Sequence, residues 1–239
     1  MPLAFGTSYH ATIQSGRQIT DQAVKISQFA AAVGEPILAE KLLNYAFDLA
    51  DSQDKPSVEQ MLAAISDLLT FIHDRLKTYL RDQGIRHDVI DACLAMPGND
   101  DLTLLVKRAE ALAAFLKTDD GPNLLQGYKR ASTILAQAEA KDGVEYSYGA
   151  DVRFADCDEE RALFAALDAA EAKITPAMRT EDFAAAMAAM ASLRAPIDGF
   201  FTAVQVNADS EILRRNRLNL MHRIRTLCGQ VADLTKLEG

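Results

Sequence analysis

The stretch that decides the fold lies at residues 56–84 and reads PSVEQMLAAISDLLTFIHDRLKTYLRDQG. Its apolar residues recur every three or four positions over about seven turns, which is the spacing of one face of an α-helix. Ser57 can cap the first turn and Gln60 can complete a capping box, while Gly84 suits a left-handed helix end. The members of the apolar stripe are Val58, Met61, Leu62, Ile65, Leu68, Leu69, Ile72, Leu76, Tyr79 and Leu80. The stretch predicts a long regular helix near residues 57–82.

Most of the remaining sequence repeats this helical periodicity in shorter runs. Helices are expected at about residues 20–33, 36–50, 86–95, 101–117, 122–139, 156–172 and 210–232. A further Ala- and Met-rich helix is expected to begin at Thr175-Pro176 or Thr180 and to bend at Pro196, because proline removes a backbone donor and crowds the preceding turn. The predicted fold is an all-α helical bundle. It comprises an unassigned helical N-terminal segment at residues 1–56 and a helical domain at residues 57–239.

Residues 141–155 interrupt the helical pattern. Val144–Tyr148 and Val152–Phe154 alternate with period two around Gly149-Ala150-Asp151. Such alternation around a turn is compatible with a small β-hairpin, but a plain linker between two helical groups is the favoured interpretation.

The composition is that of a soluble globular protein, with 239 residues of which 49% are hydrophobic and 25% charged. These proportions exclude a disordered or disulfide-stapled chain. The net charge of −9 argues against a general nucleic-acid coat or an anionic-membrane binder, but it leaves room for a local basic face.

The longest charge-free apolar stretch, residues 183–193, covers about half a bilayer, so no transmembrane helix is expected. Cys93, Cys157 and Cys228 are far apart, which favours free thiols in a reducing cytoplasm over a zinc or disulfide site.

No catalytic or metal site emerges from the motifs. The patterns G-x-x-x-x-G-K-[ST], G-x-G-x-x-G and G-x-S-x-G are absent. The dipeptides His73-Asp74 and His87-Asp88 are the central feature of metal-dependent phosphohydrolases of the HD type. Such a site needs further ligands, and the remaining histidines, His10 and His222, follow no recognisable pattern. We therefore expect both dipeptides to lie on helix surfaces and assign no catalytic residue and no metal ligand.

Two basic clusters stand out against the acidic average. Residues 212–227 contain five arginines and no acid. These arginines are Arg214, Arg215, Arg217, Arg223 and Arg225. In the second cluster, Tyr128-Lys129-Arg130, an aromatic ring adjoins two cations, a combination that suits base stacking and phosphate contact. The ordinary alternatives are a solvated arginine face and an exposed Lys-Arg pair beside a core tyrosine.

A series of motifs spread in order over about residues 65–239 resembles the C-terminal region of the bacterial glycyl-tRNA synthetase beta subunit. The motifs are RHDVIDA at 86–92, FLKTDDG at 115–121, NLLQGYKRAS at 123–132, LRAPIDGFF at 193–201, VN at 206–207 and RNRL at 215–218. The resemblance implies a helical anticodon-binding domain similar to the one that closes arginyl-tRNA synthetases. It also implies that the chain is the tRNA-binding end of a longer subunit and is non-catalytic alone.

The resemblance implies tRNA-Gly as a partner, and the synthetase alpha subunit as a partner through the full-length beta subunit. ATP and magnesium would serve the whole enzyme at the alpha subunit, so neither a cofactor nor a membrane partner is expected for this fragment. The implied interface residues are Tyr128, Lys129 and Arg130 on the anticodon loop and Arg214, Arg215 and Arg217 on backbone phosphates.

Two alternatives to tRNA binding stay open from the sequence. One is a helical scaffold or subunit-interaction module that binds no RNA, and the other is an HD-type phosphohydrolase. Salt-dependent tRNA binding separates the first alternative from an RNA-binding module, while a bound divalent metal would support the second.

Overall fold

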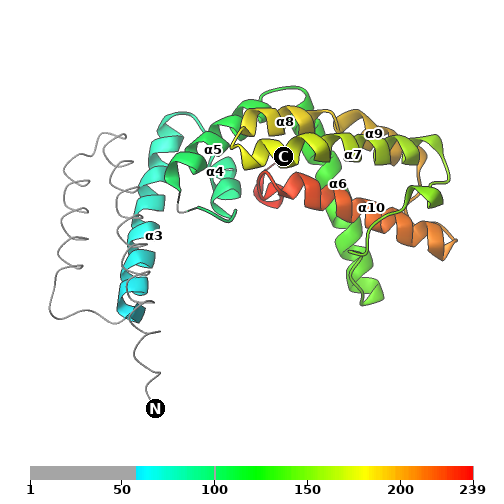
Figure 1. Ribbon diagram of the computed structural model, residues 1–239, viewed down its shortest axis with the longest axis horizontal. Helices are drawn as coiled ribbons and strands as arrows, with labels where there is room; N and C mark the ends of the chain where they lie inside the picture. Colours follow the sequence, from blue (N-terminus) through cyan, green and yellow to red (C-terminus); the bar gives the residue numbers. More distant parts are fainter. Residues whose placement is uncertain (1–57, 100, 239) are drawn as a thin grey trace, which may run out of the picture. The chain divides into compact units, whose positions relative to one another are not determined.

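The computed structural model describes residues 58–99 and 101–238, and their regular secondary structure consists of helices joined by turns and loops (Figure 1). The elements are α3 (Val58–Asp82), α4 (His87–Leu94), α5 (Leu102–Leu116), α6 (Asp120–Asp142), η1 (Val152–Phe154), α7 (Asp158–Arg179), α8 (Phe183–Ala191), α9 (Arg194–Ala203), α10 (Glu211–Gly229) and η2 (Leu234–Lys236). No strand occurs within the described ranges, so the predicted all-α fold is confirmed. The helices expected at 20–33 and 36–50, and the cap at Ser57, lie outside the described residues.

The described residues divide into two compact units. The first contains residues 58–82, 98–99 and 101–106, and the second contains residues 83–97 and 107–238. The chain thus passes between units at residues 82 and 83, inside the domain expected at 57–239. The boundary expected between residues 56 and 57 falls at the edge of the described region and stays a prediction.

In the first unit, α3 is the longest of the described helices, as its apolar stripe predicts. Ile72, Leu76 and Leu80 are buried and lie four residues apart, on one face of this helix. The helix ends at Asp82, and Gly84 follows with a φ of 81°, the left-handed conformation expected there.

In the second unit, α6, α7, α9 and α10 pack around a common core, α8 packs along α7, and η2 packs on α4. The fully buried side chains at its centre include Leu124, Leu135, Leu163, Leu167, Ile174, Met190, Leu193 and Phe200. Gly127 brings α6 close to α9, because a Cβ at this position would lie 2.7 Å from Ile197 Cγ2. A small residue is therefore required where the two helices meet.

The helix breaks differ from the prediction at one proline and agree with it at another. The expected start at Thr175-Pro176 or Thr180 is wrong, since α7 continues through Pro176 to Arg179. The helix tolerates Pro176 because the residue stands in the last turn, where only one backbone bond is lost. Asp182 then caps α8 by accepting from the Ala185 amide at 2.9 Å. The expected bend near Pro196 is present as the break between α8 and α9, and the proline lies in the first turn of α9.

Residues 143–157 form a loop containing the short helix η1, so the hairpin alternative is wrong and the linker alternative describes this segment. The loop is pinned to α10 by Asn216. The Asn216 side chain accepts from the Asp151 amide at 2.8 Å and donates to the Asp151 carbonyl at 3.1 Å. This pairing takes up the backbone groups of Asp151 that a strand ladder would have used.

Candidate nucleic-acid interface

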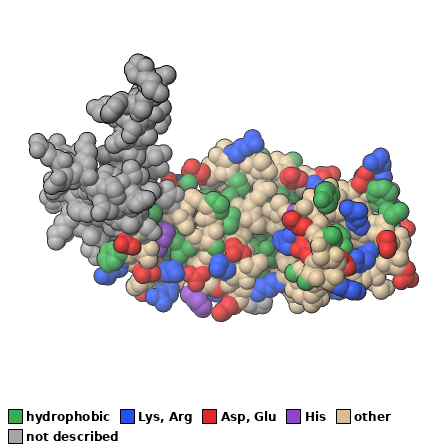
Figure 2. Space-filling view, turned by 90° about the horizontal axis from the view of Figure 1, so that it is seen from below, with side chains coloured by type: hydrophobic (Ala, Val, Ile, Leu, Met, Phe, Trp, Pro, Cys, Tyr) green, Lys and Arg blue, Asp and Glu red, His purple; other side chains and the backbone are tan. Residues whose placement is uncertain are grey.

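The basic cluster of the sequence lies on α10, and its arginines are largely neutralised by acids from other helices. Four of the five form ion pairs. The pairs are Arg214 with Asp142, Arg217 with Glu160, Arg223 with Asp168 and Glu171, and Arg225 with Glu139. The expected free cationic face is thus replaced by a network with α6 and α7, and on the described face drawn in Figure 2 positive and negative side chains are interspersed.

Arg217 belongs to the core of this network. It is 8% exposed, its guanidinium donates to Glu160, which is 1% exposed, and Nη1 donates to the Gln205 carbonyl at 3.0 Å. A phosphate could reach Arg217 only by replacing a buried partner, which would leave the Glu160 charge uncompensated. The geometry corrects the predicted phosphate contact: Arg217 is a structural residue.

Arg214 stabilises the junction of α6, the loop and α10. Its Nη2 lies 2.6 Å from Asp142 Oδ2, and its Nη1 donates to Tyr146 Oη at 3.1 Å. Tyr146 in turn donates to Asp142 at 2.6 Å. The hydrogen bonds from Tyr146 and Arg214 hold the pKa of Asp142 below its ordinary value. Arg214 is part-exposed but engaged, so it positions its neighbours rather than offering a free charge.

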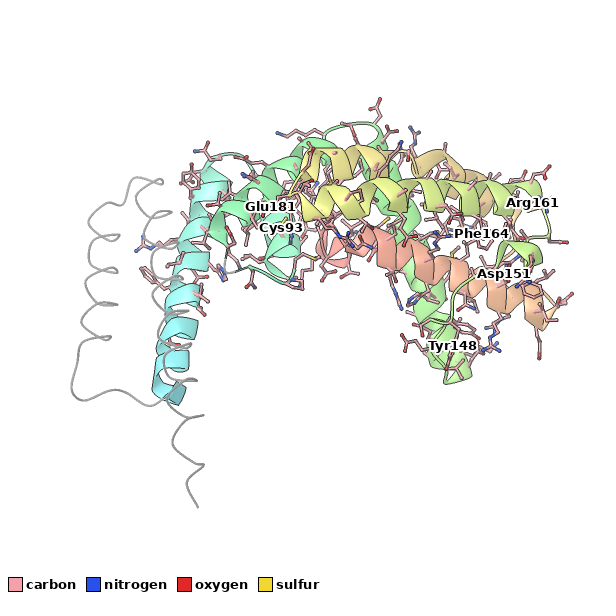
Figure 3. All side chains as sticks on the ribbon, in the orientation of Figure 1. Cys93, Tyr148, Asp151, Arg161, Phe164 and Glu181 are labelled. Carbon is pink, nitrogen blue, oxygen red and sulfur yellow. The ribbon has the colours of Figure 1, made fainter. Side chains whose placement is uncertain are left out.

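Arg215 is the arginine of α10 that is exposed. Its guanidinium lies 5.8 Å from the centroid of the Tyr148 ring, and Tyr148 is 83% exposed. Figure 3 shows Tyr148 beside the last turns of α6, on the loop that follows this helix. An exposed aromatic ring beside an exposed guanidinium is the combination that single-stranded nucleic acids use for stacking.

A groove separates this loop from the first turn of α10, and we call it the Tyr148 groove. It is lined by Val144, Glu145, Tyr146, Ser147, Tyr148, Glu211, Arg214 and Arg215. The exposed large apolar side chains of the second unit gather at the same end of α10 and in the adjoining loop. They are Val144, Tyr148, Val152, Phe154 and Ile212. A concentration of exposed apolar side chains next to a groove is typical of a binding surface.

The second predicted cluster consists of a buried tyrosine, a half-buried lysine and an exposed arginine. Tyr128 is 3% exposed, and burial raises its pKa, so its ring cannot stack on a base. Lys129 donates to the Leu237 carbonyl, and the Arg130 guanidinium lies 4.4 Å from the centroid of Phe201. The structure therefore corrects the stacking role assigned to Tyr128 and supports the ordinary alternative of a core tyrosine.

The two predicted clusters also lie toward opposite ends of α6. Tyr128 is in its first half, while Asp142, the partner of Arg214, is its last residue. At 1.5 Å per residue the two positions are roughly 20 Å apart along the helix. Sequence reasoning missed Tyr148 because the segment around it was interpreted as a linker or a small hairpin and was assigned no site residue. The sequence does show a tyrosine next to a glycine, Tyr148-Gly149, but nothing in the sequence indicates that this tyrosine is exposed.

The candidate interface lies in a part of the chain that matches a known protein family. Residues 124–238 match the family model of the DALR anticodon binding domain. This region is a DALR anticodon-binding domain. Both predicted clusters and the Tyr148 groove fall inside the DALR domain, and the FLKTDDG motif precedes it.

Relatives with curated descriptions extend the likeness beyond the DALR domain. The chain is 76% identical over 173 residues to the glycine--tRNA ligase beta subunit of Cereibacter sphaeroides, covering 72% of this chain and 25% of the relative. It is 69% identical over 192 residues to that of Dinoroseobacter shibae, covering 80% and 27%, and 51% identical over 174 residues to that of Rhodospirillum centenum, covering 72% and 24%. The resemblance deduced from the motifs is confirmed, and the chain spans about a quarter of the length of these relatives.

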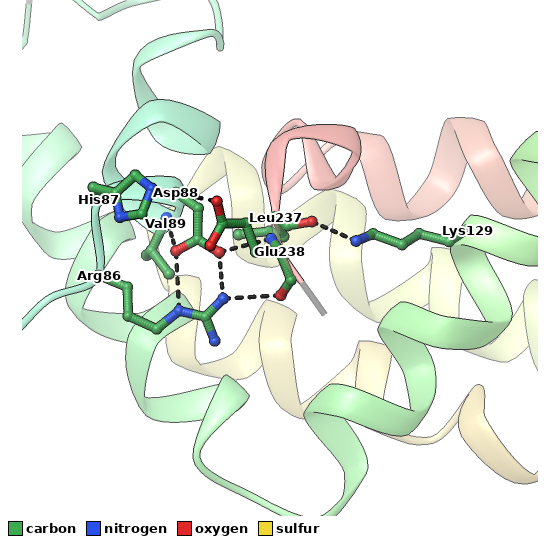
Figure 4. Close-up of polar contacts among 7 residues, drawn as sticks. All are labelled: Arg86, His87, Asp88, Val89, Lys129, Leu237 and Glu238. Carbon is green, nitrogen blue, oxygen red and sulfur yellow. Dashed lines mark hydrogen bonds and ion pairs between the residues drawn. The ribbon is translucent and has the colours of Figure 1, made fainter.

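The end of the DALR domain is held by a polar clamp around Asp88 (Figure 4). Asp88 is 2% exposed and accepts from Arg86, from the Val89 amide at 2.9 Å and from the Glu238 amide at 2.7 Å. Arg86 also donates to the Glu238 carbonyl at 2.8 Å. Burial raises the pKa of Asp88, but the bonds from Arg86 and the two amides outweigh it and leave the pKa below its ordinary value. This acid of the second His-Asp dipeptide therefore has a structural role.

No set of three or more His, Cys, Asp and Glu side chains in the described ranges is arranged to hold a metal ion. The imidazole Nε2 of His73 lies 2.8 Å from the Asn99 carbonyl. All three cysteines are free thiols, and burial raises the pKa of Cys93 and Cys228 to about 12. Among the described helices, none is long and apolar enough to cross a membrane.

Proposed function

We propose that this chain binds the anticodon stem-loop of tRNA-Gly as part of a glycine–tRNA ligase beta subunit. The observation that carries the proposal is the DALR anticodon-binding domain at residues 124–238, within a chain 76% identical over 173 residues to such a subunit. The Tyr148 groove supports it, since it combines an exposed ring with an exposed guanidinium inside that domain. Unpaired bases of an RNA loop are recognised through stacking and contacts to their edges.

The charge of the chain restricts how binding occurs. A net charge of −9 repels a polyanion at long range, and most arginines of α10 are already paired. Affinity therefore comes from stacking and a few local cations rather than from a broad basic surface. The salt dependence is accordingly modest, because its slope counts the phosphates that the protein neutralises.

Glycine activation with ATP and magnesium belongs, in this proposal, to the alpha subunit, which the full-length beta subunit contacts in the cytoplasm. In support, the sequence lacks the phosphate-binding motifs tested above. The chain alone is expected to form neither glycyl-adenylate nor glycyl-tRNA. Glycine-dependent pyrophosphate exchange by the purified chain, free of alpha subunit, would contradict this.

The test is a titration of the 239-residue chain with labelled tRNA-Gly and with a tRNA that carries another anticodon. We expect tighter binding of tRNA-Gly, and retention of the preference when isolated anticodon stem-loops replace the tRNAs. Equal, weak binding of both RNAs at low salt would favour the alternative of a helical scaffold that contacts only protein.

A further inference from the structure

The Tyr148 groove has the features of a pocket for a single flat ligand. Its lining includes an exposed tyrosine ring, the hydrogen-bonded pair of Tyr146 and Arg214, and two carboxylates. We propose that the groove binds one unpaired nucleobase that carries an exocyclic amino group. This inference rests on the proposed function, because it names the part of the RNA loop that the groove would hold.

The stacking surface is the ring of Tyr148. At 83% it is the most exposed of the large apolar side chains in the described residues, although the loop bearing it is well anchored. Arg215 contacts this ring at 5.8 Å from its centroid, and a base stacked beside them would meet both a π face and a delocalised cation. Stacking of one base on an aromatic side chain contributes enough affinity to be measured by alanine substitution.

The base of the groove is preorganised. Tyr146 is buried and joins Asp142 to Arg214, and Asn216 holds the loop through both backbone groups of Asp151. These contacts fix the loop on either side of Tyr148 before any ligand arrives. A ligand that finds its stacking partner already positioned loses less affinity to the ordering of side chains.

The polar edge of the groove selects the kind of base. Glu145 and Glu211 line it, and neither forms an ion pair in the part of the chain that the structure describes. An ionised carboxylate can only accept hydrogen bonds, so it pairs with the amino group of cytosine or adenine, or with the N–H edge of guanine. Uracil lacks an exocyclic amino group, and the two carbonyl oxygens that flank its single N3–H donor would face the negative charges, which disfavours it.

The test measures the affinity of the full chain for the tRNA-Gly anticodon stem-loop and for a set in which each loop nucleotide in turn is abasic. Tyr148→Ala should weaken binding of the intact stem-loop roughly 10-fold to 100-fold, whereas Tyr148→Phe should bind nearly as wild type does. Tyr79→Ala, an exposed tyrosine of the other unit, is the matched control and should have no effect. One abasic position should weaken wild type about as much as Tyr148→Ala does and should cost that variant little more.

The carboxylates are tested at the same position. Replacing the seated base by uracil should weaken wild type roughly tenfold, and the double variant Glu145→Gln/Glu211→Gln should lose that discrimination. Wild type that binds the stem-loop while Tyr148→Ala binds equally well, or while no abasic site matters, would overturn the pocket and leave the proposed function standing. Wild type that binds no stem-loop would overturn both.

Discussion

The first half of α6 and the loop that follows this helix carry similar residues in different surroundings. In the first half of α6, a tyrosine adjoins a lysine and an arginine: Tyr128 is in the core, Lys129 donates to the Leu237 carbonyl, and Arg130 is exposed with its guanidinium over the Phe201 ring. After its end, Tyr148 meets Arg215 in the open, in a groove. The sequence of the Tyr128-Lys129-Arg130 cluster suggests RNA binding more strongly, but the exposed tyrosine ring is in the Tyr148 groove. Exposure, rather than residue type, separates a candidate binding site from a packing contact.

The same contrast holds within α10 between two arginines only two positions apart. Arg215 is exposed beside a loop, whereas Arg217 is buried against Glu160. Two positions on a helix correspond to a rotation of about 200°, which turns one side chain to solvent and the other to the core. The comparison therefore predicts opposite phenotypes for neighbouring substitutions.

The largest expected effect is on stability. Arg217→Ala should lower the free energy of unfolding by about 3–5 kcal/mol, because it leaves the buried Glu160 carboxylate without its partner. Arg215→Ala, the neighbouring control, should change it by less than about 0.5 kcal/mol. Urea unfolding monitored by circular dichroism measures both. Equal stability of the two variants would remove the distinction drawn between these arginines.

The clamp around Asp88 should make the stability of the protein sensitive to acid. Asp88→Asn should cost about 1.5–3 kcal/mol at neutral pH, since three donors lose a charged acceptor. Because the folded-state pKa is lowered, the wild-type advantage is present above the unfolded-state pKa and is lost as pH falls below about 4. Urea midpoints of wild type and variant should therefore converge in acid. Asp209→Asn, at an exposed position, is the control and should change the urea midpoint little at neutral pH.

The close contact of α6 and α9 gives a third prediction about stability. Gly127→Ala should destabilise the protein by about 1–3 kcal/mol, because the new Cβ would meet Ile197 Cγ2 at 2.7 Å. Gly199→Ala is a matched control on α9 with no atom within 4 Å of the added Cβ, and it should stabilise by up to about 1 kcal/mol. Thermal melts distinguish the two signs. A neutral Gly127→Ala would show that the helices separate at no cost.

The sequence predicts the helices well because amphipathic periodicity is local: Ile72, Leu76 and Leu80 of the predicted stripe are buried as expected, whereas Tyr79 is exposed. It fails at the arginines because their partners are distant, with 72 positions between Arg214 and Asp142 and 57 between Arg217 and Glu160. The exposure of Tyr148 was equally unpredictable, since alternation in a short segment does not distinguish a strand from a loop. The domain family was predictable because several motifs of the family occur in order along the sequence.

The smallest expected effect is on the salt dependence of RNA binding, and it decides whether Arg130 or Arg215 contacts phosphate. Arg215→Gln and Arg130→Gln each remove one positive charge, so the change in long-range attraction for RNA is the same. A direct phosphate contact adds about 0.7 to the slope of log affinity against log salt for a single strand. Both guanidiniums are exposed and lie over an aromatic ring, but only Arg215 lines the Tyr148 groove, so only Arg215→Gln should flatten the slope for the anticodon stem-loop. Titrations at several salt concentrations measure both slopes. A flattened slope for Arg130→Gln with an unchanged slope for Arg215→Gln would reverse the comparison and assign phosphate contact to the cluster that the sequence favoured.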